Sequence, residues 1–209
     1  QATEREDRSG FTRDDVFLER QTQPYTEYFA VNEYLVRHRT YSGDTTGPLR
    51  RAVFMAVDAL TVLPYDPARD RVLLVEQFRA APYARGDRHP WLLEPIAGRI
   101  EPGDTADETA HKEAGEEAGL RLQALHRIGS YYPSTGCFSE YLVSFIGIAD
   151  LPDTAEGLHG VEDEGEDIRT QLVSRADLLD RIAAGEMPDG PLLLSAYWLE
   201  LNRARLQAG

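Results

Sequence analysis

The sequence has almost no cysteine and no long apolar run. Cys137 is the single cysteine among 209 residues, which excludes a disulfide bond within the chain and suits a reducing compartment. No apolar segment approaches the roughly 20 residues that a membrane-spanning helix needs, and the polar start QATEREDRSG lacks the character of a signal peptide. We therefore expect a soluble, cytoplasmic protein.

Positive charge is also in short supply. The chain has 22 Lys and Arg residues against 36 Asp and Glu residues, which gives a formal net charge of −14 at pH 7. This balance opposes broad contact with nucleic acid or with an anionic membrane. A phosphate-bearing ligand would therefore require a metal ion and a few local arginines. Repeats of a fixed period are absent too, which argues against solenoids and propellers.

What the chain does have is a strongly acidic helical segment. Glu113, Glu116 and Glu117 are three and four residues apart, so their carboxylates project from one face of a helix. Their mutual repulsion costs an isolated helix about a few tenths of a kcal/mol per pair. Mg2+ or Mn2+ would relieve it, because these ions prefer carboxylate oxygens as ligands. The pattern predicts a metal platform, with a plain solvated acidic helix as the alternative.

The limits of this helix can be read from its flanking residues. Thr105 followed by Glu108 forms a capping box, which predicts the start of the helix after the loop that begins at Gly98. Gly119 supplies the left-handed residue that ends many helices.

The remainder of the chain predicts the fold class. Residues 16–41 are rich in β-formers, which predicts two or three antiparallel strands ahead of the main fold. Their aromatic side chains exceed what one small domain can cover, so we expect a homodimer. We assign residues 1–50 to the tail and the dimer-forming strands. Strands and helices alternate through residues 51–209, which predicts one α/β domain with a mixed sheet between helices.

Two segments of that domain are expected to be loops. Residues 80–90 are rich in proline, glycine and arginine, and residues 150–167 form a long acidic stretch. Loops as long as the second one are usually functional or disordered inside compact domains.

The acidic segment resembles the signature box of the Nudix hydrolases. That box runs glycine, five residues, glutamate, seven residues and then Arg-Glu-apolar-x-Glu-Glu-x-Gly-apolar. The matching positions here are Gly98, Asp104, Lys112, Glu113, Ala114, Glu116, Glu117, Gly119 and Leu120. Asp104 replaces the usual glutamate, and Lys112 replaces the usual arginine. Lysine lacks the planar fork of arginine, so we expect a looser hold on the metal-binding glutamate.

The resemblance extends from about residue 16 to about residue 205. The segments LPYDPARD, LLVEQFR, PWLLEPIAG and HG-x-x-DEGEDI look like the ADP-ribose pyrophosphatase branch of the Nudix hydrolases. The likeness implies a Nudix-type α/β/α sandwich with a mixed β-sheet. It also implies Mg2+-dependent cleavage of ADP-ribose to AMP and ribose 5-phosphate, with Mn2+ as a possible substitute, by a homodimer whose N-terminal strands are exchanged.

The resemblance also assigns roles to residues. It implies metal binding by Glu113, Glu117, Glu166 and the carbonyl of Ala97, and catalysis by Glu164 as general base together with Glu116. Without the family, the run that holds Glu164 would be read as a solvated acidic loop.

Substrate contacts follow from the same match. They are Tyr28 and Phe29 on adenine, Arg51 and Arg79 on the phosphates or adenosine, and Ser134, Gly136 and Glu140 at and after a turn that in the family reads Ser-Pro-Gly. Here that turn reads Ser134-Thr135-Gly136, with the proline at Pro133. Two alternatives therefore stay open: a hydrolase of another nucleotide sugar such as GDP-mannose, and a Nudix module that senses a nucleotide without cleaving it.

Overall fold

The computed structural model describes residues 10–161 and 165–208 of the chain. These residues divide into two compact units, each described here by itself. The smaller unit contains the chain up to Ala56 together with Ser134–Glu140, and the larger unit contains Val57–Pro133 and Tyr141–Gly209.

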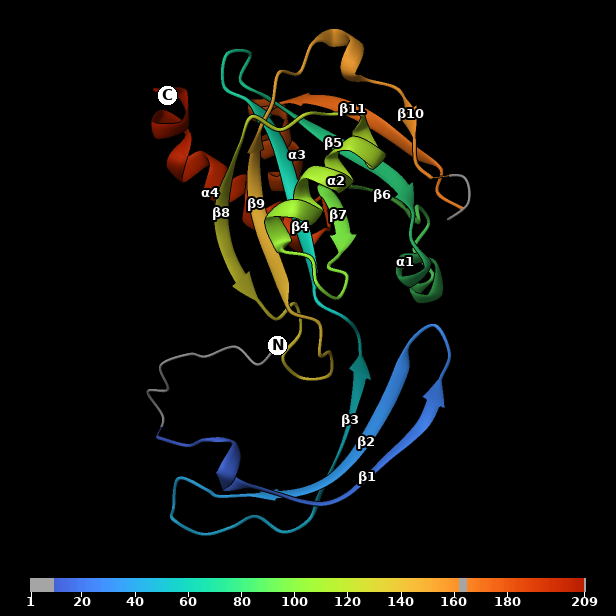
Figure 1. Cartoon of the computed structure of the whole chain (residues 1–209), viewed down its shortest axis with the longest axis vertical. Coiled ribbons are helices and arrows are strands. Elements are labelled where there is room, and N and C mark those ends of the chain that lie inside the picture. The colour runs from blue at the N-terminus through green and yellow to red at the C-terminus, as the bar shows by residue number, and fades with distance from the viewer. Residues whose placement is uncertain (1–9, 162–164, 209) are drawn as a thin grey trace. The chain divides into compact units, whose positions relative to one another are not determined.

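The smaller unit is a three-stranded antiparallel sheet in the order β1-β2-β3 (Figure 1). Its elements are η1 (Arg13–Asp15), β1 (Val16–Thr26), β2 (Ala30–His38) and β3 (Leu49–Met55). The expected antiparallel strands ahead of the main fold are thus confirmed.

A later segment of the chain completes this unit. The amide of Phe54 donates to the carbonyl of Cys137 at 2.8 Å, and the amide of Ser139 donates to the carbonyl of Phe54 at 3.0 Å. These two bonds tie the segment that follows Pro133 to the end of β3.

The larger unit is built on a mixed sheet. Its strands are β4 (Ala59–Asp66), β5 (Arg71–Phe78), β6 (Trp91–Glu94), β7 (Ile96–Arg99), β8 (Ala124–Tyr131), β9 (Leu142–Ile148), β10 (Leu158–His159) and β11 (Ile168–Ser174). The order is β10-β11-β5-β4-β9-β8, with β6 paired to β5 and β7 paired to β4. Strands β4 and β9 run parallel, and the other pairs are antiparallel. The mixed sheet is therefore confirmed.

Helices cover both faces of this sheet. The larger unit also contains α1 (Ala80–Arg85), α2 (Ala106–Ala118), η2 (Asp153–Ala155), α3 (Arg175–Ala183) and α4 (Gly190–Gln207). Helix α2 lies in front of the sheet in Figure 1, and α3 and α4 lie behind it. No helix within the described ranges is long and apolar enough to cross a membrane.

Alternation along the central strands explains the two layers. On β5, Leu73 and Val75 pack with the buried alanines of α2, whereas Val72 and Leu74 pack with α3 and α4. Because both faces are buried, the strand is an almost continuous apolar run. The expected α/β/α sandwich is confirmed.

Both expected loops contain regular structure. Residues 80–85 form α1, so the expectation of a loop was wrong there. The helix is short, lacks a side-chain cap at its start and contains Pro82, so the sequence carries no helical signal, although Gly86 ends it in the left-handed conformation. The acidic stretch 150–167 contains η2 and β10 within its described part.

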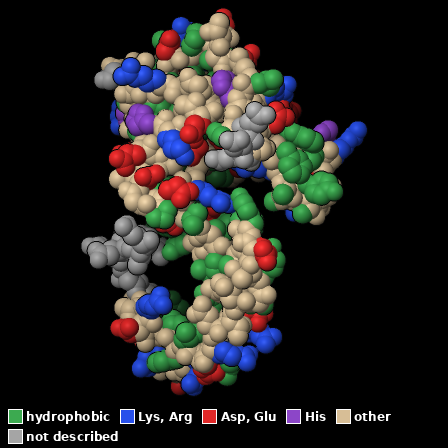
Figure 2. All heavy atoms as spheres, turned by 45° about the vertical axis from the view of Figure 1, so that its right-hand side comes forward, with side chains coloured by type: hydrophobic (Ala, Val, Ile, Leu, Met, Phe, Trp, Pro, Cys, Tyr) green, Lys and Arg blue, Asp and Glu red, His purple; other side chains and the backbone are tan. Residues whose placement is uncertain are grey.

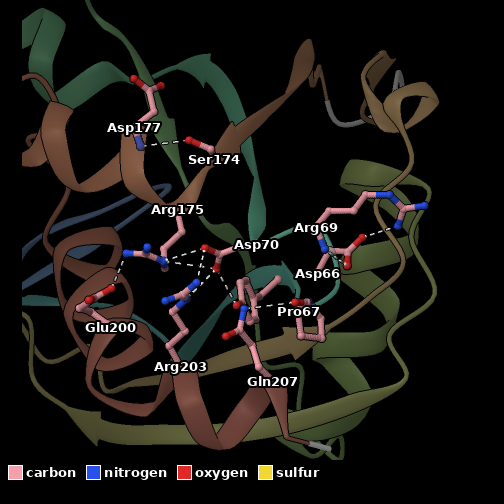
Figure 3. Close-up of polar contacts among 11 residues, drawn as sticks. Asp66, Pro67, Arg69, Asp70, Ser174, Arg175, Asp177, Glu200, Arg203 and Gln207 are labelled. Carbon is pink, nitrogen blue, oxygen red and sulfur yellow. Dashed lines mark hydrogen bonds and ion pairs between the residues drawn. The ribbon is translucent and has the colours of Figure 1, made fainter.

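An ion-pair network joins the turn between β4 and β5 to α3 and α4 (Figure 3). The carboxylate of Asp70 accepts hydrogen bonds from Arg175, from Arg203 and from the hydroxyl of Tyr65 at 2.8–3.3 Å. Burial alone would raise the pKa of Asp70, but the hydrogen bonds from Arg203, Tyr65 and Arg175 outweigh it and hold the pKa below its ordinary 3.8.

This network predicts acid-sensitive stability. Because the folded-state pKa of Asp70 is depressed, its contribution is complete above the unfolded-state pKa and is lost as pH falls through the folded-state pKa. We expect Asp70→Asn to lower the free energy of unfolding at pH 7 by about 1–3 kcal/mol, with a smaller difference near pH 3. Urea unfolding of both proteins across this pH range measures the effect.

The matched control is Asp177→Asn on α3. Asp177 forms an exposed ion pair with Arg181, so its loss should cost less than about 0.5 kcal/mol. Equal effects of the two substitutions, or a pH-independent effect at Asp70, would contradict this account of the network.

Candidate active site

Helix α2 forms as its sequence predicts. The side chain of Thr105 accepts from the amide of Glu108, and the side chain of Glu108 accepts from the amide of Thr105, which completes the capping box. Gly119 ends the helix with φ 62, a left-handed conformation that glycine adopts at little cost. The start and end of the acidic helix are thus as expected.

Burial differs sharply among the three glutamates of α2. Glu117 is 3% exposed, and the side chains of Glu113 and Glu116 are 15% and 39% exposed. The helix packs closely because Ala110, Ala114 and Ala118 on its buried side are small. Glu117 therefore lies inside the protein, Glu113 is largely buried, and Glu116 faces solvent.

Glu117 is the most perturbed of these carboxyl groups. Its Oε2 accepts a hydrogen bond from the amide of Ala97 at 3.2 Å. Burial raises the pKa of Glu117 to about 8, with further increases from the negative charges of Glu113 and Glu166 and opposing effects from the Ala97 amide and Arg79. As an anion, Glu117 needs more positive charge than its surroundings provide.

Gly98 allows Glu113 to lie against the strand. Strand β7 runs alongside α2, and a Cβ atom at Gly98 would overlap the Glu113 side chain. The glycine at the start of the box is therefore required by this close approach.

Lys112 contacts two of the box glutamates. Its Nζ lies 3.6 Å from Oε2 of Glu116 and 4.0 Å from Oε1 of Glu113. These distances exceed ordinary hydrogen-bond lengths, so lysine acts here as a point charge rather than as a two-point clamp.

Glu166 is hydrogen-bonded to Val161. Its Oε2 accepts from the amide of Val161 at 3.1 Å, and its own amide donates to the carbonyl of Val161 at 3.3 Å. Glu164, the expected general base, falls outside the described residues.

The negative charge of the expected ligands suits a hard divalent cation. The expected ligands supply three carboxylates, of which Glu113 and Glu166 act electrostatically on the buried Glu117. Within the described ranges, which leave out residues 162–164, no three His, Cys, Asp or Glu side chains already converge on one point. The fit therefore rests on uncompensated negative charge among oxygen donors. Acidic and basic side chains lie together on a face of the larger unit (Figure 2).

Arg79 supplies a cation to the same region. It follows β5, its Nε donates to Oε2 of Glu94 at 2.8 Å, and its Nη2 forms an ion pair with the same oxygen at 2.7 Å. Its charge also acts on Glu117 and on Asp189, the N-cap of α4. Burial raises the pKa of Asp189 to about 6, and the nearby Glu94 contributes to the increase.

Sequence reasoning missed Glu94 and Asp189 as neighbours of Arg79. Glu94 lies within PWLLEPIAG, where nothing in the sequence indicates an ionic partner. Asp189 precedes Gly190-Pro191, so its sequence signal is that of a helix cap and gives no sign of an ionic partner.

The remaining expected substrate residues belong to the smaller unit. Tyr28 is 73% exposed and meets Phe29 edge to face with ring centroids 4.7 Å apart. Arg51 lies on β3, where its Nη1 donates to the carbonyl of Arg50 at 2.9 Å. The other three, on the segment that completes this unit, are Ser134, Gly136 and Glu140.

The larger unit thus gathers Arg79, Ala97, Glu113, Glu116, Glu117 and Glu166. The other substrate candidates belong to the smaller unit.

Comparisons with known proteins agree with these features. The family model of the NUDIX domain matches residues 55–193. The ADP-ribose pyrophosphatase of Escherichia coli strain K12 is 36% identical over 197 residues, covering 94% of this chain and 93% of that protein. The ADP-ribose pyrophosphatase of Haemophilus influenzae is 33% identical over 199 residues, covering 94% of this chain and 91% of that protein.

A second group of relatives is similar over less of the chain. The GDP-mannose pyrophosphatase of Salmonella paratyphi A is 32% identical over 153 residues, covering 73% of this chain and 78% of that protein. Among solved structures, a crystal structure of an ADP compounds hydrolase superposes with a TM-score of 0.63 at 18% identity, covering 89% of this chain and 95% of that one. At that identity the superposition shows the fold alone.

The close approach at Gly98 predicts a loss of metal affinity on substitution. In Gly98→Ala the added methyl group must displace the Glu113 side chain, so we expect the affinity for Mn2+ to fall by about tenfold or more. Electron paramagnetic resonance of free Mn2+ in titrations of the purified protein measures this.

Gly115→Ala on α2 is the matched control. A Cβ there meets no atom within 4 Å, so the change should stabilise the helix by about 0.5–1 kcal/mol and leave Mn2+ affinity unchanged. A folded Gly98→Ala protein with unchanged Mn2+ affinity would remove Glu113 from the metal site.

Proposed function

The chain belongs to the Nudix family, and from this membership we propose that it is an ADP-ribose pyrophosphatase. Water cleaves the diphosphate linkage of ADP-ribose, which yields AMP and ribose 5-phosphate. One observation carries the proposal: the similarity to ADP-ribose pyrophosphatases covers 94% of the chain and so includes both units.

Mg2+ is the proposed metal, with Mn2+ as a substitute. The residues that would hold it are Glu113, Glu117, Glu166 and the carbonyl of Ala97. When bound, such an ion screens phosphoryl oxygens and lowers the pKa of a coordinated water. The burial of Glu117 beside two further carboxylates supports this assignment.

The protein's own groups then have distinct roles. Arg79 binds the negatively charged diphosphate, since it provides a guanidinium beside the acidic helix. Glu164 takes a proton from the attacking water. Glu116 is the second catalytic carboxylate, and its exposed side chain near Lys112 leaves it accessible to solvent and substrate.

The smaller unit provides recognition of the nucleoside and sugar. Tyr28 and Phe29 present exposed aromatic surface on which adenine can stack, and Arg51 adds a cation. Ser134, Gly136 and Glu140 contact the remainder of the substrate.

We further propose a cytoplasmic homodimer that exchanges the strands of residues 1–50, with residues 51–209 as the Nudix domain. Strand β1 is exposed along its whole length, which supports a partner for this sheet.

GDP-mannose hydrolysis is the second candidate. The Salmonella relative supports it, as does the Ser134-Thr135-Gly136 turn, which lacks the proline typical of ADP-ribose enzymes. The retained carboxylates Glu113, Glu116 and Glu117 argue against a non-catalytic sensor.

A substrate panel separates these possibilities. Purified protein with Mg2+ is incubated with ADP-ribose, GDP-mannose, NADH and diadenosine polyphosphates, and products are followed by chromatography. We expect kcat/KM for ADP-ribose to exceed the others by about tenfold, which corresponds to roughly 1.4 kcal/mol of transition-state binding. Preference for GDP-mannose would establish the second candidate, and absence of turnover would favour a sensor.

The proposed base predicts the effect of one neutral substitution. Glu164→Gln should lower kcat by about 10² or more, because the attacking water loses its proton acceptor, while Mn2+ affinity stays nearly unchanged. Glu117→Gln is the contrasting control and should lose Mn2+ affinity as well as activity. Near-normal kcat in Glu164→Gln would place the base elsewhere.

A further inference from the structure

Glu94 is a buried acid with a cationic partner, Arg79. It ends β6 and is 6% exposed, and its Oε2 atom accepts a hydrogen bond from Nε of Arg79 and forms an ion pair with Nη2. A carboxylate buried to this extent requires a charged partner to remain ionised at moderate cost. Glu94 therefore lies in the interior of the larger unit, whereas the side chain of Arg79 is 38% exposed.

Arg79 is held at two places along its length. Its backbone amide donates to the carbonyl of Pro90 at 2.8 Å, which fixes the main chain where β5 ends. Glu94 then fixes the guanidinium by its Nε–Nη2 edge, so the Nη1 group takes no part in this pair. An arginine held in this way presents a defined donor instead of a freely rotating charge.

Other carboxylates compete for the same guanidinium. Glu117 on α2 and Asp189 at the start of α4 both act electrostatically on Arg79. Asp189 is already engaged, because its carboxylate accepts from the amide of Leu192 at 2.7 Å. Without Glu94, Arg79 would be drawn toward Glu117 and away from an incoming anion.

We propose that Glu94 is a positioning residue, which holds the guanidinium of Arg79 where it meets the substrate diphosphate beside the acidic helix. This inference rests on the proposed function, in which Arg79 binds that diphosphate. Glu94 acts only through Arg79 and touches neither substrate nor metal.

A double-mutant cycle tests the proposal. Glu94→Gln keeps the size and one oxygen acceptor but removes the charge. We expect KM for ADP-ribose to rise about tenfold while kcat changes less than about threefold, because Arg79 keeps its charge and loses its position. Glu94→Asp, which retains the carboxylate, should recover at least part of the loss.

The cycle is closed in an Arg79→Ala background. There Glu94→Gln should change kcat/KM by less than about twofold, because the guanidinium that Glu94 positions is absent. A further tenfold loss in that background would overturn the proposal, as would a kcat defect with unchanged KM in the single mutant. If Glu94→Gln does not fold, Glu94→Asp provides the test, because its shorter side chain shifts the carboxylate that holds Arg79. It should raise KM with kcat nearly unchanged, and an unchanged KM would overturn the proposal.

Glu76→Gln is the matched control on the neighbouring strand. Glu76 pairs with Arg169 at the surface, so removing its charge should leave KM and kcat unchanged. Failure of the proposed function is seen separately, as wild-type protein that does not turn over ADP-ribose. If the protein hydrolyses GDP-mannose instead, the cycle is carried out with that substrate, because both compounds contain the diphosphate. If it hydrolyses neither, the dissociation constant of ADP-ribose is measured for each variant in place of KM.

Discussion

The close packing of α2 against the sheet is the constraint on which the candidate site depends. Helix α2 approaches its neighbours closely because Ala110, Ala114 and Ala118 are small, and Gly98 offers no side chain where Glu113 crosses β7. This packing carries Glu117 into the interior as a carboxylate. Substituting larger residues along this side of α2 would move the glutamates outward into water, where they would no longer need a cation.

The cost of that buried charge is distributed over several elements. Arg79 acts on Glu117, but it is also bonded to Glu94 and influenced by Asp189, so only part of its charge compensates the acidic helix. The region as a whole keeps an excess of carboxylates. A bound divalent ion would compensate this excess of negative charge.

The sequence allowed most local features of the fold and the site to be predicted, because they depend on neighbours in the chain. The capping box at Thr105 and the stop at Gly119 are of this kind. Helix α1 has no such signal, since its start is uncapped and its turns are few. The bond between Glu94 and Arg79 joins residues that are distant in the sequence. Neither residue lies in a local sequence pattern that predicts the other as its partner.

Acidic residues in the larger unit have two opposite environments, and the difference indicates which of them are structural. Asp70 and Asp66 are surrounded by donors from the chain itself, and the pKa of each lies below its ordinary value despite burial. Within the described ranges, Glu117 accepts one amide hydrogen bond and lies near the negative charges of Glu113 and Glu166, and its pKa is raised. A carboxylate that the fold satisfies internally stabilises the fold. A carboxylate that the fold buries without satisfying it lowers stability, and such a residue is best explained by a ligand that completes its surroundings. The same physical measure therefore separates the network at the turn between β4 and β5 from the candidate active site on α2.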